Sequence, residues 1–217
     1  MTAYQLRLFE DRLDANAAFA TPLPAANRIV YVVTGVATVG TAALTAEQAW
    51  CGADELLLSA GPEGARVWRW DIVRPTDADL LGEGPGVASR ALAVGNFAVE
   101  SDGQYLMRCD SVAFPPGGVA YLHTHQGPGI RCLHHGSIRI ETEGKVFSVA
   151  PGEAWFESGP SPVFAAASQS EPTGFVRVMV LPRSLQGKSS IRYVRDEDRD
   201  KPKTQQYKVF VEEFIEI

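Results

Sequence analysis

Cysteines and basic residues are both scarce in this chain of 217 residues. Its three cysteines, Cys51, Cys109 and Cys132, are widely spaced and include no CxxC pair, which indicates reduced, buried thiols in a cytoplasmic protein. Lys and Arg number 20 against 26 Asp and Glu, so the formal net charge is −6. Because this balance implies no basic surface, neither a nucleic acid nor a membrane is expected as a partner.

Targeting segments and several common catalytic motifs are also missing. The first residues include Glu10, Asp11 and Asp14 and contain no apolar run, so no signal peptide is expected. Residues 29–46 carry no charge, but their threonines, glycines and β-branched residues favour buried strands over a membrane-spanning helix. The sequence contains no P-loop, no GxGxxG after a strand and no GxSxG elbow, so it lacks these signals for nucleotide binding and serine hydrolysis.

Long segments with the 3.6-residue period of a helix are absent, and short strand-like runs take their place. Glycine- and proline-rich turns such as GPEG, PPGG and SGPSP separate these runs. The runs rich in β-branched and aromatic residues cover 4–8, 28–33, 65–73, 104–114, 130–135, 137–142, 145–149, 175–181 and 207–217. This pattern predicts an all-β protein.

An internal repeat runs through the chain. RIVYVVTGVATV (28–39) resembles RCLHHGSIRI (131–140), with Gly35 and Gly136 at equivalent turns. LTAEQAW (44–50) resembles VAPGEAW (149–155), and ARVWRWDIVRP (65–75) resembles FVRVMVLP (175–182). Three matches in the same order predict two copies of one β-unit. We expect an N-terminal domain at 1–88 and a C-terminal domain at 89–217, with 76–86 as a surface connection.

All four histidines, His123, His125, His134 and His135, lie within thirteen residues. Residues two apart on a strand point to the same face, so His123 and His125 present two imidazoles side by side, as a chelating pair would. The alternative is a pair of ordinary solvated or hydrogen-bonded histidines.

The spacing around this pair resembles the first motif of the cupin superfamily, G(x)5HxH(x)3–4E(x)6G. Gly117 begins the motif, His123 and His125 follow, and Gly136 closes it, while Gly152 matches the start of the second motif. The resemblance covers roughly residues 25–75 and 90–183. It implies a bicupin, an all-β chain with two double-stranded β-helix (cupin or jelly-roll) barrels.

This resemblance implies a divalent metal ion (Fe, Mn, Ni or Zn) held by His123 and His125. Two of the usual ligand positions differ, because Gly129 replaces the glutamate and Val163 replaces the third histidine. Gly129 is therefore expected to leave an open position for water or substrate on the metal. The first repeat has no histidine, so it is expected to have a filled apolar core and no metal.

Other residues of the second repeat are candidates to complete the site. Glu157 is the better candidate for a third ligand and Gln126 the weaker one, although Glu157 is equally placed for an ion pair with Arg131. Arg131 needs a carboxylate if it points into the barrel, either Glu157 or an anionic ligand, and otherwise reaches out of the barrel mouth. His134 and His135 are expected at a strand end or a subunit contact.

Three functions remain open at this point. The first is a metal-dependent enzyme (oxygenase, lyase or isomerase) that acts on a small anionic, carboxylate-bearing molecule, with Arg131 and Glu157 as catalytic residues. The second is a metal-free protein that binds or senses a small molecule, and the third is a structural scaffold. A homodimer is expected, because the strand-like ends at 4–8 and 207–217 can cross between subunits and cover sheet edges.

Overall fold

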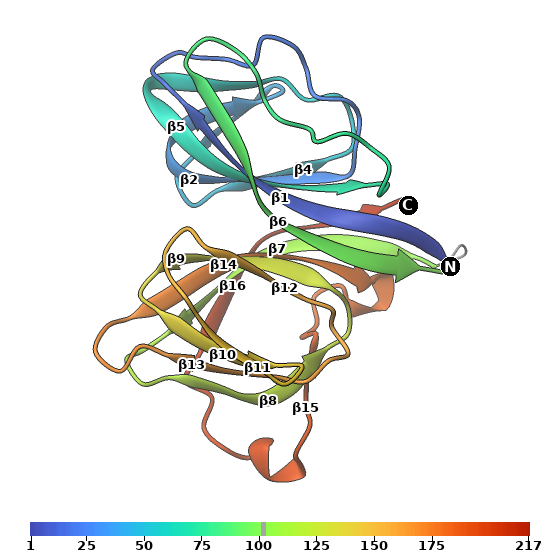
Figure 1. Cartoon of the computed structure of the whole chain (residues 1–217), viewed down its shortest axis with the longest axis vertical. Coiled ribbons are helices and arrows are strands. Elements are labelled where there is room, and N and C mark those ends of the chain that lie inside the picture. Colours follow the sequence, from blue (N-terminus) through green and yellow to red (C-terminus); the bar gives the residue numbers. More distant parts are fainter. Residues whose placement is uncertain (101–102) are drawn as a thin grey trace. The chain divides into compact units, whose positions relative to one another are not determined.

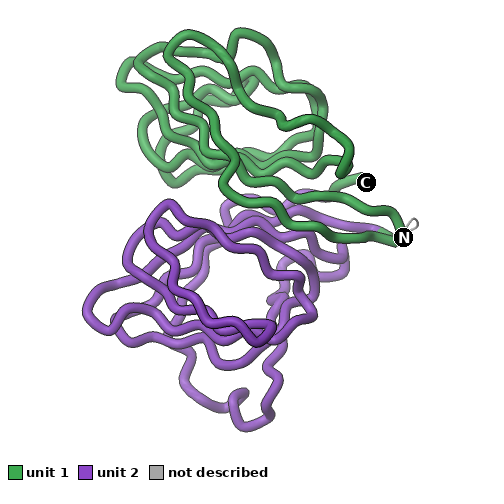
Figure 2. Tube along the Cα trace, viewed as in Figure 1, with its two compact units in different colours: residues 1–103, 215–217 green, residues 104–214 purple. Residues whose placement is uncertain are grey.

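The computed structural model describes residues 1–100 and 103–217. Its regular structure is β-strand apart from two short 3-10 helices, η1 (Arg183–Leu185) and η2 (Asp196–Asp198). The chain divides into two compact units (Figure 2), the first formed by Met1–Gly103 with Ile215–Ile217 and the second by Gln104–Phe214. Among the described residues, no helix is both long and apolar enough to span a bilayer. The predicted all-β class is confirmed.

The first unit is an antiparallel six-stranded sheet in the order β3-β2-β5-β1-β6, with β4 also paired to β2 (Figure 1). Its strands are β1 (Thr2–Leu13), β2 (Arg28–Val39), β3 (Ala42–Thr45), β4 (Ala49–Gly52), β5 (Leu58–Val73) and β6 (Val87–Val99). β1 pairs with β5 on one edge and β6 on the other. The N-terminal strand is therefore occupied within its own chain, and the expectation that it crosses to a second subunit is wrong.

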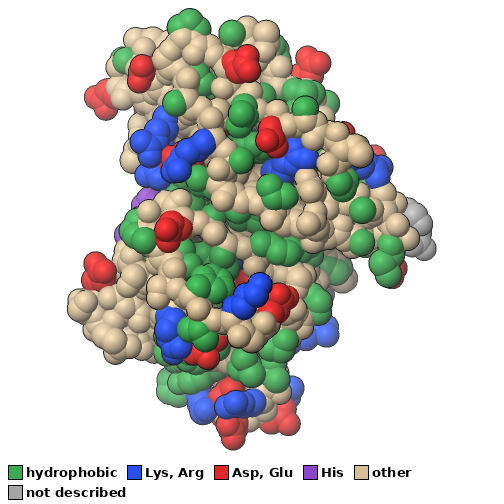
Figure 3. Space-filling model, viewed as in Figure 1, with side chains coloured by type: hydrophobic (Ala, Val, Ile, Leu, Met, Phe, Trp, Pro, Cys, Tyr) green, Lys and Arg blue, Asp and Glu red, His purple; other side chains and the backbone are tan. Residues whose placement is uncertain are grey.

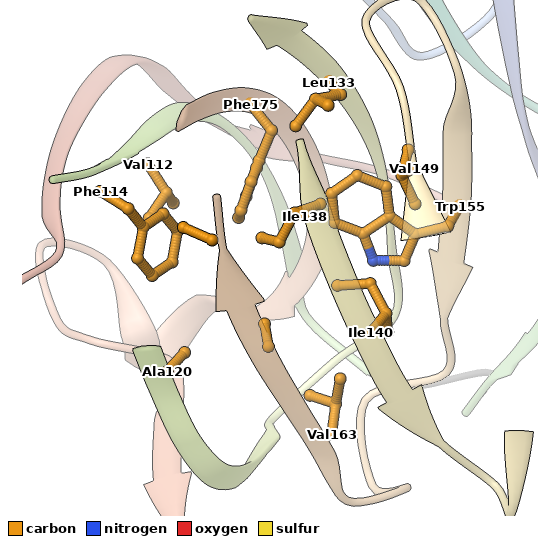
Figure 4. Packing of buried hydrophobic residues seen from close by; sticks show 12 residues of the cluster. Val112, Phe114, Ala120, Leu133, Ile138, Ile140, Val149, Trp155, Val163 and Phe175 are labelled. Atoms are coloured by element: carbon orange, nitrogen blue, oxygen red, sulfur yellow. The ribbon is translucent and has the colours of Figure 1, made fainter. Parts of the chain in front are cut away.

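The second unit has two five-stranded antiparallel sheets in the orders β12-β9-β14-β7-β16 and β11-β10-β13-β8-β15. The first contains β7 (Tyr105–Phe114), β9 (Gly129–His135), β12 (Ala154–Glu157), β14 (Thr173–Pro182) and β16 (Gln206–Ile215). The second contains β8 (Val119–His125), β10 (Ile138–Thr142), β11 (Lys145–Val149), β13 (Val163–Ala167) and β15 (Ile191–Tyr193). The two sheets enclose a barrel whose interior holds a buried apolar cluster (Figure 4).

The two units repeat one topology. The order β4-β2-β5-β1-β6 of the first matches the order β12-β9-β14-β7-β16 of the second. Ala49 pairs with the residue four before Gly35, and Ala154 pairs with the residue four before Gly136. Both glycines have left-handed backbone, with φ of 79° and 77°, and a Cβ on Gly136 would lie 2.5 Å from Pro172 O. One sheet of each unit therefore shares a strand order and a turn glycine, as the internal repeat predicted.

The boundary between the units lies later than expected. β6 pairs along β1 from Leu13↔Val87 to Thr2↔Val99, so it completes the first sheet instead of starting the second unit. The boundary at 88/89 is therefore replaced by one at 103/104. The connection before β6 is also held by this unit, because Arg7 donates to the carbonyls of Asp77 and Ala78.

The interior of the first unit is apolar at one end only. Val30 and Val67 belong to its apolar cluster, but Arg28, Arg69, Asp11 and Asp71 are also fully buried. Arg28 Nε lies 2.6 Å from Asp71 Oδ1, Arg69 Nε lies 2.8 Å from Asp11 Oδ2, and Arg69 also bonds Asp71. The expectation of an apolar filling is wrong at this end, where paired charges take the place of hydrocarbon.

The surface carries charges of both signs. On the face shown in Figure 3, basic and acidic side chains are interspersed in small groups. This agrees with a chain whose 20 basic and 26 acidic residues give it a modest negative charge.

Candidate functional site

A cavity of about 220 Å³ lies inside the barrel of the second unit. Its wall includes all four residues that the sequence analysis singled out as catalytic or metal-binding. His123 and His125 come from β8 in one sheet, while Arg131 of β9 and Glu157 of β12 come from the other. The two sheets therefore bring these residues together from opposite walls.

The histidine pair has its ring nitrogens turned toward each other. His123 Nε2 lies 3.2 Å from His125 Nε2. His123 Nδ1 lies 2.7 Å from the carbonyl oxygen of Tyr121, which only accepts, so Nδ1 carries the proton and Nε2 keeps a lone pair. His125 Nδ1 lies 3.2 Å from Ser190 Oγ, a hydroxyl that can donate to Nδ1 or accept from it. Protonated at Nδ1, His125 turns a second Nε2 lone pair toward His123; protonated at Nε2, it donates a hydrogen bond to His123 Nε2.

Burial keeps this pair neutral at pH 7. It lowers the pKa of His123, against the opposing attraction of the nearby Glu157 carboxylate. Burial lowers the pKa of His125 further, and the positive charges of Arg131 and Arg177 act in the same direction. Neutral imidazole is the form that binds a metal ion, so the two Nε2 atoms are available as ligands.

Arg131 points into the barrel and its side chain is 1% exposed, so the alternative of an outward arginine is wrong. Its Nη2 lies 2.7 Å from Glu157 Oε2, and its Nη1 donates to the carbonyl of Gly129 at 2.7 Å. Burial lowers its pKa to about 10, which still leaves the guanidinium charged at pH 7. The sequence-based expectation that a buried Arg131 meets Glu157 holds in this geometry.

Glu157 connects the two halves of the site. Its Oε1 accepts a hydrogen bond from Trp155 Nε1 at 2.8 Å, and its Oε2 lies 3.6 Å from His125 Nε2. Arg131 Nη2 and Glu157 Oε2 are close but poorly aligned, so each remains buried without a completed hydrogen bond. A buried donor and a buried acceptor are therefore both left for a ligand to satisfy.

The histidine pair fits a divalent cation as two of its ligands. Metal–nitrogen bonds of about 2.1 Å place two nitrogens of one coordination shell about 3.0–3.4 Å apart, which includes the observed 3.2 Å. Within residues 1–100 and 103–217, however, no cluster of three or more His, Cys, Asp or Glu side chains is arranged to hold a metal. Further ligands would have to come from a bound molecule or from a shift of Glu157.

Gly129 does not open the site as expected. A Cβ at this position would lie 2.6 Å from Val178 O and 2.9 Å from Met179 Cγ, so the space is already filled. The carbonyl of Gly129 instead anchors Arg131. The vacancy inferred from the missing glutamate is closed by its neighbours on β14.

The remaining sequence candidates lie apart from the cavity wall. Gln126 accepts a hydrogen bond from Arg192. His134 is half-buried, His135 is exposed, and their Nδ1 atoms lie 3.3 Å apart at the end of β9. The expected strand-end placement of this pair is what the structure shows.

Several residues of the cavity wall were not anticipated. Ser190, Tyr193 and Lys203 lie on the segment between β14 and β16, where no functional residue was predicted. Only their position beside β8 in the fold gives them a role. Arg177 also lines the cavity, and the sequence contained a signal for it, because it lies two residues from Phe175 on a predicted strand and therefore shares a face with it.

Comparison with known proteins gives structural likeness only. No protein-family model matches the chain, and no curated protein matches its sequence. One similar structure is an oxalate decarboxylase, solved to describe a structural element that modulates proton-coupled electron transfer. It is 13% identical to this chain with a TM-score of 0.64, and the match covers 91% of this chain and 73% of that one. Lactobacillus farciminis oxalate decarboxylase in a formate complex is 12% identical with a TM-score of 0.64, covering 90% and 82%.

AerE from Microcystis aeruginosa is a further structural neighbour, at 14% identity with a TM-score of 0.57, covering 83% of this chain and 88% of that one. These identities are low, so the likeness concerns the fold. The chain has the cupin fold, as the motif around His123 and His125 indicated.

Proposed function

We propose that the barrel of the second unit binds a small carboxylate-bearing molecule next to a divalent cation held by His123 and His125. The observation that carries the proposal is the pair of neutral imidazoles, whose Nε2 atoms face each other beside Arg131 in the cavity of the barrel. The two Nε2 atoms lie 3.2 Å apart, as expected for two nitrogens on one cation, and both lone pairs are available to it when His125 carries its proton on Nδ1.

The charge of the wall supports an anionic ligand. Arg108, Arg131, Arg177 and Lys203 line the cavity, and Glu157 is the acidic residue among the described lining. Arg108 and Arg177 are paired with Glu212 and Asp110, so Arg131 is the guanidinium placed to bind a carboxylate through hydrogen bonds. Two of the structural neighbours are described as oxalate decarboxylases, one of them bound to formate, so carboxylates are bound on this fold.

An enzyme of this kind would divide the work between the cation and the chain. The bound cation would polarise the carboxyl or carbonyl oxygen of the ligand. Arg131 would orient the ligand through its carboxylate, and Glu157 would accept or return a proton at Oε2, which completes no hydrogen bond in the structure. The buried apolar wall would exclude water. Whether the reaction is an oxygenation, an elimination or an isomerisation depends on the ligand.

A metal-free binding protein is the second candidate. It is favoured by the contact between Arg131 and Glu157, because that ion pair engages the carboxylate best placed to be a third metal ligand. In this alternative the two histidines donate to or accept from the ligand directly. Metal content distinguishes the two candidate functions, because the first requires a bound divalent cation and the second does not.

The decisive experiment is metal analysis followed by titration of the purified full chain. We expect one equivalent of bound divalent metal in the parent and none in His123→Ala, with His135→Ala as the control outside the cavity. Adding propionate should tighten Mn²⁺ or Zn²⁺ binding roughly tenfold in the parent and have little effect in Arg131→Lys, which keeps the charge but loses the planar fork. Propionate binding that is indifferent to metal would instead support the second candidate.

A further inference from the structure

The cavity has an apolar end formed by both sheets. Phe175 of β14 pairs with Val112 of β7 and with Leu133 of β9, which places three apolar side chains in one layer. The buried cluster that lines the cavity from this end includes Val112, Phe114, Ile140, Ala165 and Phe175, whereas Val163 lies opposite His123. Figure 4 shows the labelled members of this cluster pointing into a shared interior space.

The next layers along the same strands are charged. Two residues from Phe175, Arg177 pairs with Asp110 on one side and Arg131 on the other. In the following layer Glu157 lies opposite Gly129. A molecule inside the barrel therefore meets hydrocarbon at one end and charge at the other.

Most of the basic side chains at the charged end are already occupied. Arg177 bonds Asp110 through both Nε and Nη2, and Arg108 bonds Glu212 and two backbone carbonyls. Lys203 bonds three backbone carbonyls in the turn around η2. These cations have partners within the protein, so they offer little to a second anionic group.

Arg131 is paired too, with Glu157 at 2.7 Å, but its buried Nη2 completes no hydrogen bond among the described residues, so this donor is still available to a ligand. One guanidinium donor beside one histidine pair makes a single recognition point for a carboxylate. A ligand with a second carboxylate would have to place it in the apolar layer, where a charge without a partner is strongly disfavoured.

The volume of the cavity limits the size of the ligand's apolar part. A protein cavity of about 150 Å³ lined by aliphatic and phenylalanine side chains holds benzene. The cavity of about 220 Å³ therefore has room for one ring and a short acidic side chain.

We infer that the ligand is a monocarboxylate with one ring, or a branched apolar body of the same size, and not a small dicarboxylate. Its carboxylate lies at Arg131 and the histidine pair, and its apolar body packs against Phe175, Ile140 and Ala165. This inference rests on the proposed function and narrows it to one class of ligand.

The test is calorimetric titration of the full chain with four probes, each in chelator and in excess Mn²⁺. The probes are 3-phenylpropionate, propionate, glutarate and 3-phenylpropan-1-ol, which separate the ring from the number of carboxylates. We expect 3-phenylpropionate to bind at least about tenfold tighter than the other three, because only it satisfies both ends of the cavity.

Filling the apolar end provides the matched variant. Ala165→Leu should weaken 3-phenylpropionate about tenfold and leave propionate unchanged, with Ala165→Val as a milder version if the leucine lowers the melting temperature. Val146→Ala, on an exposed edge, is the control. If glutarate binds as tightly as 3-phenylpropionate, the inference is overturned but the site still binds carboxylates. If the alcohol binds as tightly as the acid, the inference is also overturned, because the carboxylate then contributes nothing. If no carboxylate binds under either metal condition, the proposed function itself fails.

Discussion

Arg131 and Glu157 form a buried ion pair in the wall of the cavity. Each is nearly inaccessible to solvent, and each has an atom at the site without a completed hydrogen bond. Removing one member leaves the other as an uncompensated buried charge, which costs far more than the pair contributes.

We therefore predict that Arg131→Met lowers the free energy of unfolding by about 3–5 kcal/mol. The matched control is Arg139→Met, since Arg139 pairs with Glu141 on the surface with its side chain 48% exposed. That exposed pair should contribute less than about 1 kcal/mol. Urea denaturation of the three proteins measures both values, and equal losses in the two variants would contradict the buried-pair account.

The neutral histidine pair predicts how stability responds to pH. Both folded-state pKa values lie below the unfolded value of 6.5, so the unfolded chain binds protons that the folded chain does not. The stabilisation is complete above pH 6.5 and is lost as pH falls below it. In chelator, urea unfolding should show a decline between about pH 6.5 and 5 that is smaller in His125→Gln and unchanged in His135→Gln. If the free energy of unfolding falls with pH equally steeply in the parent and in His125→Gln, the decline does not come from His125.

Gly129 shows where residue identity alone misleads. The sequence gives a glycine in a position where a larger ligand is usual, and space was inferred from the missing side chain. In the structure Met179 and Val178 fill that space, and a Cβ would meet them at 2.9 and 2.6 Å. The filling comes from β14, about fifty residues away in sequence, so no local pattern could reveal it.

At the scale of elements, β1, β2 and β5 share an ionic layer inside the first unit. Asp71 bonds both Arg28 and Arg69, and all three are fully buried. We predict that Asp71→Ala destabilises the protein by about 3–5 kcal/mol, because it leaves the buried Arg28 without a carboxylate and leaves Arg69 with Asp11 alone. Asp79→Ala is the control, since Asp79 also meets an arginine but is 60% exposed and should cost less than about 1 kcal/mol. Denaturant unfolding gives both values, and a small loss in Asp71→Ala would mean that water reaches this layer.

Strands were predicted correctly from the sequence where β-branched and apolar side chains cluster, and they were missed or shortened where such side chains are few. β14 and β9 were predicted because their β-branched and apolar residues cluster at strand length. β6 was missed because VASRALAVGNFAV contains mostly small residues, and β5 was cut short because GPEG reads as a turn although the strand runs through it. Pairing with long neighbours, β1 for the first and β2 for the second, supplies what the local sequence lacks.

At the scale of the whole molecule, the internal repeat was the most informative feature of the sequence. It predicted two units of one topology, because matching segments in constant order require matching strands. It could not place the boundary, since β6 and β16 close their sheets in equivalent positions without resembling each other in sequence. The site followed from the motif at His123 and His125, while Ser190 and Lys203 depended on a segment outside the repeat.

The last strand of the chain carries the prediction about assembly. β16 lies at the end of its sheet beside β7, and among the described strands none pairs with its other edge. Tyr207, Val209 and Phe214 on this strand are exposed, at 59%, 43% and 48%. A long edge strand with exposed apolar side chains invites pairing with a second copy, and a lysine on such an edge discourages it.

We predict a homodimer joined through β16, seen as a dimeric mass by analytical ultracentrifugation at micromolar concentration. Val209→Lys should shift the protein toward monomer, because the charge would be desolvated in the paired edge. Leu57→Lys is the control. Leu57 is similarly exposed, at 45%, but it lies in the connection from β4 to β5 of the first unit and not on an edge strand. If the parent sediments as a monomer, the predicted homodimer is wrong. If Val209→Lys is folded and still dimeric, the dimer does not form through β16. A dimer that persists in Val209→Lys would point to β6, the corresponding edge of the first sheet, where Val94 is 47% exposed.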